Sequence, residues 1–374
     1  MKVSLFVHDL SSNPIVRAYP IAKAIQSLGH EVEILGLTYY TKEIYEPYRN
    51  EFEFKTIHSY DDIRWVIING YKLSKMATGD IVYVFKPVWG TLWPGLLYAW
   101  FGLKKRIILD AEDNELWAAF IGNGWKALLK NKYYPVNPVY NKLLHPLTFL
   151  IKRKTVVCSQ LQKRYGGKIV LHGPKAEKFD PALYPEKQQG RLQFNLPQNI
   201  PLLLFAGKPV YYNGVPALIK ALSHPLAKGW HLVLAGNPQS DIFKEAKVTL
   251  GERCHLLGFL PNEKMPHLVN VVDLIPIIQT PIPSTEFQIP AKMLEAMAMG
   301  KGIITTNVCD MNTLLGEKRG WVLDYKNIDQ LPNLLAHLEQ HMSEIETKGK
   351  EARAYFLNEA SIEVIAKKIE VFFK

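Results

Sequence analysis

Two glutamates, a proline and a lysine stand close together in residues 284–302, STEFQIPAKMLEAMAMGKG. A polar loop with Glu286 leads to Pro290, and an apolar helix pattern carrying Lys292 and Glu295 follows. Proline suits the first turn of a helix, where its missing N–H has no intrahelical partner. The unpaired N–H groups of that turn and the helix dipole form a site for an anion such as a pyrophosphate. Glu295, about one turn further on, is placed to accept hydrogen bonds from a pair of sugar hydroxyls. A capped helix with both acids solvated is the alternative interpretation.

A second group of residues suited to phosphate chemistry lies in the segment FAGKPVYYNGV, after a strand pattern. Gly207 allows the backbone to come close to a phosphate, and Lys208 supplies a positive charge at the same point. Asn213 precedes the next glycine of this segment. The alternative interpretation makes Lys208 an ordinary surface lysine.

The next two strand patterns end in short turns, LAGN and LLGFLP, which contain Gly236, Asn237, Gly258, Phe259 and Leu260. Taken singly, each is only a strand-to-helix turn. Their order is more informative, since the basic turn, LAGN, LLGFLP and the glutamate helix follow one another over about 95 residues. In this order the chain resembles the family-4 retaining glycosyltransferases of the GT-B fold, whose signature has two glutamates flanking a Pro/Lys helix start.

The resemblance implies that the second half binds a nucleotide-sugar donor, a UDP- or GDP-sugar, and that neither a metal nor another cofactor takes part. Lys208, with the N–H groups near residues 288–291, would stabilise charge on the departing phosphate. Glu286 would orient the sugar, and Glu295 would hold the ribose. The implied donor site comprises Gly207, Lys208, Asn213, Gly236, Asn237, Gly258, Phe259, Leu260, Ser284, Thr285, Glu286, Ile289, Pro290, Lys292 and Glu295.

Two positions depart from the family pattern. Asn213 stands where a lysine is usual, so one of two expected phosphate cations is replaced. Eight residues separate Glu286 from Glu295, one more than is common. Because Glu295 keeps its place relative to the proline and lysine of the helix start, the extra residue lies in the loop. Ser284 and Thr285 therefore compete with Glu286 for the sugar contact.

The elements that must position these residues alternate along the chain. At 374 residues with 48% apolar side chains, the chain is too long for one ordinary core. Strand patterns alternate with helical patterns, which indicates parallel sheets covered on both faces. The expected strands are residues 3–7, 31–37, 52–57, 81–85, 106–110, 155–158, 168–171, 201–207, 230–236, 254–259, 273–278 and 302–306.

The sequence therefore predicts an α/β protein with two doubly wound Rossmann-like domains facing a central cleft, as in the GT-B fold. The expected domains are residues 1–185, which bind the acceptor, and 192–356, which bind the nucleotide-sugar. The segment 180–201 is rich in Pro, Gln and Asn and is the expected linker. A helix at about 357–374 is expected to pack back on the first domain. In such folds ligands bind at the carboxyl ends of the strands.

The first half offers candidate acceptor residues at two predicted strand ends. The first strand runs into a turn with His8, Asn13 and Arg17, without the GxGxxG that a dinucleotide fold places there, which argues against an NAD enzyme. A later strand ends in LDAEDNE, where four acids in six residues repel one another unless a cationic or hydroxyl-rich ligand binds them. These acids are Asp110, Glu112, Asp113 and Glu115.

We assign Asp110 and Asp113 as candidate catalytic groups that orient the acceptor nucleophile, and Glu112 as an acceptor contact. N-capping of the helix pattern ELWAAF by Asp113 and Asn114 is the alternative. His172, in the turn LHGPKAEKFDP, is expected to contact the acceptor as well. No histidine or second acid stands at a spacing typical of a metal site.

Positive charge is concentrated in the first half of the chain. The net charge is +10, and residues 117–168 contain ten basic side chains and no acidic one. Aromatic and aliphatic residues alternate with these lysines and arginines, which is typical of contact with an anionic membrane surface, worth about 1 kcal/mol per basic residue. Nucleic acid would also accept such a patch, but no nucleic-acid motif accompanies it. A solvated basic face is a third interpretation.

Between Lys86 and Lys104 lie seventeen uncharged residues, and this length is at the lower limit for a membrane span. Prolines and glycines interrupt the segment, and Trp89, Trp93, Leu96 and Trp100 fall at helical spacing. We therefore predict a buried crossover helix, with an interfacial segment or a span as alternatives.

Three widely spaced cysteines indicate neither disulfides nor a zinc site, and the first ten residues resemble a strand rather than a signal peptide. We expect a cytoplasmic protein, peripheral at the inner face of the membrane. The expected function is retaining transfer of a sugar to a glycan or lipid-linked acceptor. The alternatives are a non-catalytic GT-B relative that binds a glycan or a partner, an epimerase or phosphorylase of similar fold, and a nucleic-acid-binding protein.

Overall fold

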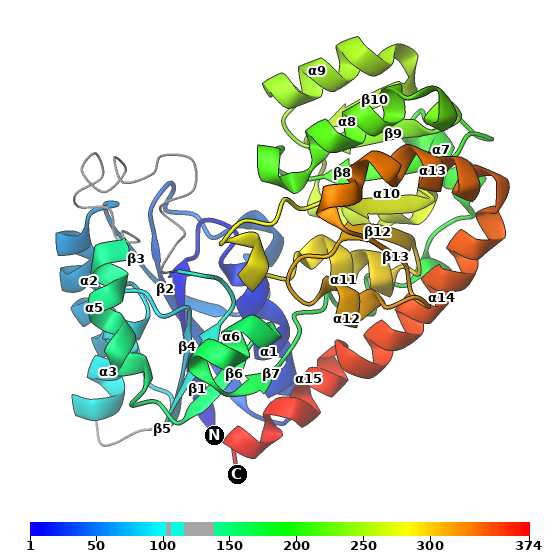
Figure 1. Cartoon of the computed structure of the whole chain (residues 1–374). Coiled ribbons are helices and arrows are strands. Elements are labelled where there is room, and N and C mark those ends of the chain that lie inside the picture. The colour runs from blue at the N-terminus through cyan, green and yellow to red at the C-terminus, as the bar shows by residue number, and fades with distance from the viewer. Residues whose placement is uncertain (102–105, 116–137) are drawn as a thin grey trace. The chain divides into compact units, whose positions relative to one another are not determined.

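The computed structural model describes residues 1–101, 106–115 and 138–374, and these form two compact units (Figure 1). The first unit contains residues 1–172 together with 362–374, and the second contains residues 173–361. The chain therefore passes between the units twice. The predicted class, α/β with two parallel sheets, is confirmed.

Among the described residues, seven strands form the sheet of the first unit, in the order β3-β2-β1-β4-β5-β6-β7. All neighbouring strands run parallel. The strands are β1 (Lys2–Asp9), β2 (Glu31–Thr38), β3 (Glu53–His58), β4 (Ile81–Phe85), β5 (Arg106–Ala111), β6 (Arg153–Val156) and β7 (Lys168–Ile169).

Side chains that alternate along these strands fill two separate cores, one on each face of the sheet. Val3 and Leu5 of β1 pack in one core, and Phe6 packs in the other with Val82 and Val84 of β4. The helices that cover the two faces are α1 (Ile15–Ser27), α2 (Ile63–Met76), α3 (Leu92–Phe101), α5 (Pro138–Thr148), α6 (Ser159–Tyr165) and α15 (Ile362–Ile369). Apolar residues on both sides explain why the strands contain long apolar runs.

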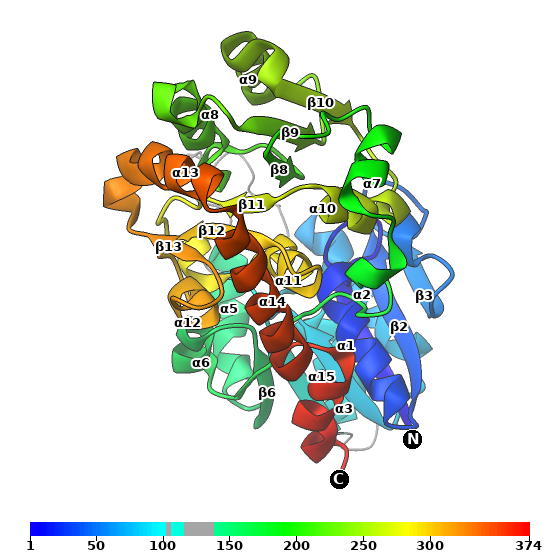
Figure 2. The ribbon, with the colours of Figure 1, turned by 90° about the vertical axis from the view of Figure 1, so that its right-hand side faces the viewer.

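Helix α15 is far from α1 in sequence and lies beside it in the first unit (Figure 2). Ile362, Ile365 and Ile369 are buried in the same core as Ile21 and Ile25 of α1. Their spacing places the three isoleucines on one face of the helix. The sequence placed this return at about residue 357, and in the structure it begins after Ser361.

The second unit holds a six-stranded parallel sheet within the described residues, in the order β10-β9-β8-β11-β12-β13. Its strands are β8 (Leu202–Ala206), β9 (His231–Ala235), β10 (Cys254–Gly258), β11 (Leu274–Ile277), β12 (Gly302–Thr306) and β13 (Trp321–Leu323). Its helices are α7 (Lys187–Gln193), α8 (Val215–Ser223), α9 (Asp241–Leu250), α10 (Met265–Val271), α11 (Ala291–Ala298), α12 (Met311–Leu315), α13 (Leu331–Gln340) and α14 (Met342–Glu359).

The segment 180–201, predicted to be a linker, belongs to the second unit. Its residues form α7, and Arg191 of that helix is 3% exposed. The Arg191 guanidinium donates to Asp273 at 2.7 Å and to the carbonyls of residues 197, 198 and 200. The polar composition of this segment therefore does not mark a linker, because the buried Arg191 holds the segment against the second unit.

The uncharged segment after Lys86 forms α3, the crossover helix between the parallel strands β4 and β5, as predicted. Leu92 and Leu96 are buried in the core, whereas Trp100, which the spacing placed on the same face, is 45% exposed. Residues 102–105 lie outside the described residues. Within the part of the chain that the structure describes, no helix is long and apolar enough to cross a membrane.

Candidate functional site

Each sheet has one topological switch point, where the connections that leave two neighbouring strands run to opposite sides of the sheet. In open α/β sheets, ligands bind at the carboxyl ends of the strands at this point. In the second unit it lies between β8 and β11, and in the first unit between β1 and β4. The predicted donor residues follow the strands of the second sheet, and most of the predicted acceptor residues follow strands of the first.

Three glycine turns adjoin one another at the carboxyl end of the second sheet. Gly207 follows β8, Gly236 follows β9, and Gly258 is the last residue of β10. All three have φ between 69° and 145°. The N–H of Gly207 donates to Ala235 at 2.9 Å, and that of Gly236 donates to Gly258 at 2.8 Å. A side chain at Gly236 would stand 2.5 Å from the Gly207 carbonyl oxygen. Glycine at position 236 is therefore required for the close approach of the turns after β8 and β9.

Lys208 is exposed and forms no ion pair that the structure records among the described residues. Asn213, where the resemblance predicts a lysine, donates from Nδ2 to the Lys208 carbonyl at 3.2 Å. The asparagine side chain therefore closes this turn locally, and Lys208 is the cation that the turn presents.

The other predicted residues of these turns differ in exposure. Phe259 presents a ring that is 77% exposed, and Leu260 is half-buried. Asn237 is exposed, and its Oδ1 accepts the N–H of Gln239 at 3.0 Å. This asparagine bond is a common local turn and needs no ligand.

The loop between β11 and α11 is braced from inside by Thr285. Its Oγ1 donates to the Thr280 carbonyl at 2.6 Å and accepts the N–H of Ile282 at 3.0 Å, and the residue is 0% exposed. The predicted sugar contact through Thr285 is therefore not supported, because the side chain is occupied within the loop. Ser284 keeps a buried Oγ without a hydrogen-bond partner among the described residues.

Glu286 is half-buried and is held by the loop that follows β12. Its carboxylate accepts the backbone N–H of Cys309 at 3.2 Å. Cys309 has a φ of 53°, which is uncommon for a residue other than glycine. The strained turn thus fixes the direction of one of the two predicted glutamates.

Helix α11 begins one residue later than the sequence suggested, because Pro290 is its N-cap with a φ of −63° and a ψ of 132°. Ile289 before it is buried. Lys292 and Glu295 are half-buried, and the Lys292 Nζ lies 4.3 Å from the centre of the Phe205 ring on β8. Burial lowers the pKa of Lys292 to about 8 and raises the pKa of Glu295 to about 7, and the charge of each opposes the shift of the other.

In the first unit, a shift in strand register between Val7 and Asp9 accompanies the turn that carries His8. The His8 Nδ1 is buried without a hydrogen-bond partner among the described residues. Burial and the charge of Lys86 lower the pKa of His8 to about 4, so the ring is neutral at pH 7. Asn13 is exposed at the start of α1.

Arg17 and Asp110 form a two-bond ion pair in the interior, with distances of 2.9 and 2.7 Å. Asp110 also accepts from Thr155 Oγ1 at 2.5 Å, and Arg17 donates to the Val170 carbonyl at 2.7 Å. Arg17 is 1% and Asp110 0% exposed. The predicted acceptor contact by Arg17 and catalytic role of Asp110 are therefore not supported, because neither side chain is accessible.

The remaining acids after β5 surround a lysine that the sequence analysis did not single out. The Lys86 Nζ lies 2.6 Å from Asp113, 3.2 Å from Glu112 and 3.3 Å from Glu115. Burial raises the pKa of Glu112 to about 7, while the charge of Lys86 opposes this shift. Lys86 follows β4 directly, so its place after a strand in a parallel sheet was the signal that could have revealed it.

His172 is the last residue of the first unit and is half-buried. Its Nδ1 has no hydrogen-bond partner among the described residues, and burial with the charge of Arg17 lowers its pKa to about 3. His172 and His8 are thus two neutral rings with an available nitrogen. No group of three His, Cys, Asp or Glu side chains could hold a metal ion within the described ranges.

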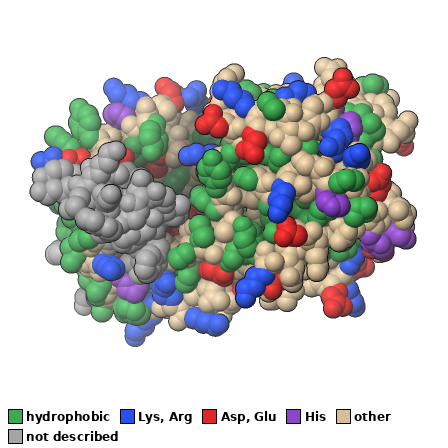
Figure 3. Space-filling model, turned by 45° about the horizontal axis from the view of Figure 1, so that its top comes forward, with side chains coloured by type: hydrophobic (Ala, Val, Ile, Leu, Met, Phe, Trp, Pro, Cys, Tyr) green, Lys and Arg blue, Asp and Glu red, His purple; other side chains and the backbone are tan. Residues whose placement is uncertain are grey.

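The basic segment 117–168 is described only from residue 138, so Lys126, Lys130 and Lys132 lie outside the described residues. In the described part, Leu143, Phe149 and Leu150 are 60–66% exposed, beside the exposed basic residues Lys142, Lys152 and Arg153. Lys154 is instead 8% exposed and donates to the Tyr165 carbonyl at 2.9 Å. On the face in Figure 3, basic side chains are spread among acidic and apolar ones.

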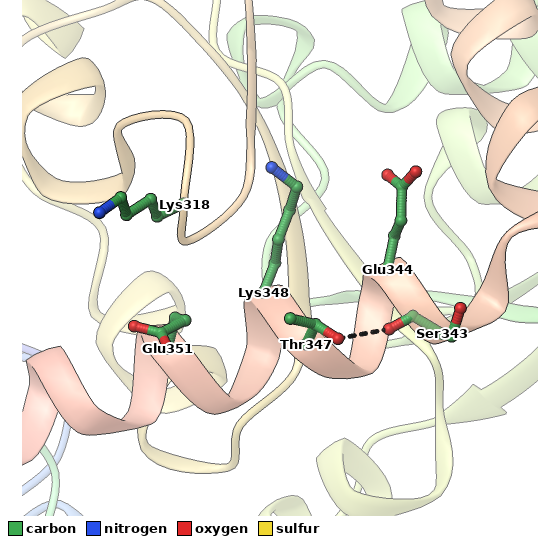
Figure 4. A pocket seen from close by; sticks show the side chains of 6 residues that line it. All are labelled: Lys318, Ser343, Glu344, Thr347, Lys348 and Glu351. Carbon is green, nitrogen blue, oxygen red and sulfur yellow. Dashed lines mark hydrogen bonds between the residues drawn. The ribbon is translucent and has the colours of Figure 1, made fainter.

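An open pocket of about 530 Å³ lies along α14 (Figure 4). Its lining is charged and polar, and it contains none of the predicted site residues. Lys348 in this lining donates to the Glu317 carbonyl and lies 5.1 Å from the Trp321 ring. The lining residues are Lys318, Ser343, Glu344, Thr347, Lys348 and Glu351.

Comparison with known proteins finds a family match in the second unit and many relatives of the fold. Residues 200–341 match the family model described as Glycosyl transferases group 1. No curated protein sequence matches the chain. In contrast to the sequence, the fold has many relatives among solved structures.

A glycosyltransferase from Rickettsia africae superposes with a TM-score of 0.74 at 16% identity, covering 99% of this chain and 97% of that one. HepE from Anabaena, solved in complex with UDP and glucose, gives 0.74 at 14% identity and covers 100% and 99%. WaaG, a glycosyltransferase involved in lipopolysaccharide biosynthesis, gives 0.71 at 16% identity and covers 100% and 99%. The two α/β units thus have the GT-B fold, and the family match supports a glycosyltransferase.

Proposed function

We propose that the protein transfers a sugar from a nucleotide-sugar to a glycan or lipid-linked acceptor, with retention of the anomeric configuration and without a metal. The observation that carries this proposal is the position of Lys292. Its ammonium, 4.3 Å from the Phe205 ring, places the start of α11 beside the strand that leads to Gly207 and Lys208. Two cations and the backbone N–H groups at the start of α11 therefore serve one diphosphate.

The donor contacts follow from this arrangement. Lys208 and Lys292 balance the charge of the diphosphate, and the N–H groups at the start of α11 donate to its oxygens. Glu295, half-buried one turn into the helix, accepts from the ribose hydroxyls. Glu286, fixed by the Cys309 N–H at 3.2 Å, accepts from a hydroxyl of the sugar. UDP-glucose is the first donor to test, because HepE was solved in complex with it.

In the proposed reaction the acceptor hydroxyl attacks the anomeric carbon from the face that the phosphate leaves. A C–O bond to the acceptor forms, the bond between the anomeric carbon and the phosphate oxygen breaks, and the acceptor proton passes to that oxygen. The products are the glycosylated acceptor and a nucleoside diphosphate. Lys208 and the helix N–H groups stabilise the charge that develops on the leaving phosphate.

The first test is a thermal-shift screen with UDP-, GDP-, ADP- and CMP-sugars, followed by transfer or donor hydrolysis with each ligand that raises Tm. Glu295→Ala should abolish both the Tm shift and the turnover, and Glu252→Ala, at an exposed position of the same unit, should leave both unchanged. A donor that binds without any turnover would favour a non-catalytic GT-B relative, for which Asn213 in place of lysine is the best support. Absence of any Tm shift would contradict both.

The acceptor side is proposed to lie close to an anionic membrane at the inner face. The support is the exposed group of Leu143, Phe149 and Leu150 with basic residues around it. Such a surface suits lipids because apolar side chains enter the interface while basic ones meet anionic headgroups. A lipid-linked or membrane-proximal glycan is therefore the proposed acceptor class.

A further inference from the structure

Lys86 has a backbone conformation that a lysine adopts only at a cost. Its φ is 67°, in the left-handed region that disfavours residues with a Cβ. Its N–H donates to the Asp110 carbonyl at 2.9 Å, and its own carbonyl accepts from Thr91 Oγ1 at 2.5 Å. The backbone is therefore held on both sides, and the side chain leaves the sheet in a fixed direction.

This fixed direction brings the lysine to the three acids that follow the neighbouring strand β5. We call Lys86, Glu112, Asp113 and Glu115 the Lys86 cluster, with Nζ–O distances of 3.2, 2.6 and 3.3 Å to the acids in that order. The Lys86 side chain is 15% exposed, and that of Glu115 is 5% exposed. Although burial opposes it, the charges of these acids hold the pKa of Lys86 well above its ordinary value.

One lysine among three acids leaves the cluster with an excess of carboxylate. Three carboxylates within four residues repel one another, and without a cation they would separate or take up protons. Next to the cluster, on β1, His8 feels the charge of Lys86 and keeps its buried Nδ1 without a partner among the described residues. The strand-end edge of the first unit thus has three carboxylates that contact one ammonium group, and a neutral His8 close to them.

We propose that Lys86 is a positioning residue for the acceptor: it holds Glu112 and Asp113 in the one arrangement that binds and orients the attacking hydroxyl. This inference rests on the proposed function, in which the acceptor binds to the first unit. Sequence resemblance did not point to Lys86, and the geometry assigns the role through the three ion pairs. The lysine itself need not touch the acceptor.

The charged groups around Glu112 determine how this arrangement responds to pH. Lys86 and Arg17 lower its pKa, while burial, Asp113 and Asp110 raise it, and the result is about 7. His8 and His172 are neutral at pH 7 and add no charge. Because Glu112 accepts a hydrogen bond best as a carboxylate, acceptor use should increase as pH rises through about 7. Removal of Lys86 should move that increase to higher pH.

The kinetic test compares Lys86→Met, Lys86→Arg and Lys86→Gly with the wild type, using the full chain and the donor found by thermal shift. Lys86→Met should lower kcat/KM for the acceptor about 100-fold, as expected when a reacting group is misplaced, and shift the pH profile upwards. Lys86→Arg should keep the wild-type profile. Lys86→Gly removes the backbone strain at a φ of 67° but also removes the positive charge, so its kinetics should match those of Lys86→Met. Lys72→Met, at an exposed position on α2, is the matched control and should change nothing.

A second measurement does not depend on activity. In protein labelled with carbon-13 at the glutamate carboxyls, the resonance that is lost in Glu112→Gln identifies Glu112. NMR spectra over a range of pH then give the midpoint of the Glu112 titration. Lys86→Met and Lys86→Gly should raise that midpoint, and Lys86→Arg should not. An unchanged midpoint, or an unchanged acceptor pH profile in an active Lys86→Met enzyme, overturns the proposal. If the wild type transfers no sugar, the proposed function fails, and the NMR titration still decides whether Lys86 controls Glu112.

Discussion

The ammonium of Lys292 lies 4.3 Å from the centre of the Phe205 ring, which joins the first turn of α11 to the last residues of β8. The two segments are separated by more than eighty residues in sequence. Phe205 leads directly to Gly207 and Lys208, so this contact brings the two predicted phosphate-binding segments together. The face of the ring also favours a cation, which helps to hold the lysine in place.

The first prediction concerns Lys292. Lys292→Met should weaken UDP binding about 10- to 100-fold, since a hydrogen bond to a charged group contributes about 1.5–3 kcal/mol. Because burial lowers the pKa of Lys292 to about 8, wild-type affinity should fall as pH rises through that value, and the variant should lack this fall. Calorimetric titrations at pH 7 and 9 measure both effects. Lys228→Met, on the exposed surface of the same unit, should bind as the wild type does; equal affinities of all three proteins would contradict the assignment.

The second prediction concerns the effect of the Glu295 carboxylate on the stability of the folded protein. Its pKa in the folded protein is raised to about 7, so its contribution to stability is present at low pH and is lost as pH rises through about 7. Glu295→Gln, which stays neutral, should therefore be more stable than the wild type by about 1–2 kcal/mol at pH 8, after allowance for solvent screening, and should differ little near pH 4.5.

Urea unfolding at the two pH values measures this difference for Glu295→Gln. The control is Glu252→Gln, because Glu252 is exposed in the same unit and its replacement should leave the free energy of unfolding unchanged. A Glu295→Gln variant that is less stable than the wild type at pH 8 would show that the carboxylate is better compensated than its burial suggests.

The third prediction separates a structural pair from a functional one. Arg17→Met leaves Asp110 buried without its cation, and the loss of one partner of such a pair costs about 3–5 kcal/mol. The exposed pair of Arg49 and Glu43, at 2.6 Å, provides the control, since Arg49→Met should cost less than about 1 kcal/mol. Chemical unfolding measures both. Equal losses in the two variants would refute the view that Arg17 serves mainly the fold.

The fourth prediction concerns the strained turn at Cys309. Since glycine accepts a φ of 53° readily, Cys309→Gly should keep both stability and the bond to Glu286. Cys309→Val, whose branched side chain opposes this conformation, should cost about 1–3 kcal/mol and reduce donor turnover. Tm and the rate of donor use give the two readouts. A valine variant as active as the glycine variant would mean that the turn does not fix Glu286.

The fifth prediction tests the membrane surface. A double variant, Phe149→Ser with Leu150→Ser, should bind vesicles of mixed phosphatidylcholine and phosphatidylserine more weakly than the wild type in a flotation assay. Binding should also fall with added salt, because surface charges are screened. Val248→Ser, which alters an exposed apolar residue of the second unit, is the control. Failure of the wild type to float with these vesicles would dismiss the proposal.

Most of the fold could be predicted from the sequence, because apolar runs between helical patterns are a strong signal for parallel strands. The twelve predicted strands all correspond to observed ones, although β6 lies at residues 153–156 rather than 155–158. The short strand β13 was missed. Its three residues, WVL, form an apolar run that is too short to predict a strand by itself.

The side-chain partners could not be predicted. Arg17 and Asp110 both follow the pattern of exposed polar residues near strand ends, and only the structure shows that each is the other's buried partner. The place of Lys86 after a strand was visible in the sequence, but its three acidic partners follow another strand, and only the structure shows that they meet. Glycines and the Pro/Lys helix start were easier to recognise, because their function depends on the backbone, which local sequence largely determines.

The placement of α15 has a consequence for synthesis of the protein. One core of the first unit contains Ile362, Ile365, Ala366, Ile369, Phe372 and Phe373, and its other members lie within residues 3–170. On the ribosome, everything needed for the second unit emerges before these isoleucines do. The core of the first unit therefore stays incomplete, and the face of α1 that packs on α15 stays exposed, until translation has passed residue 373. All residues of the second unit have been synthesised by then.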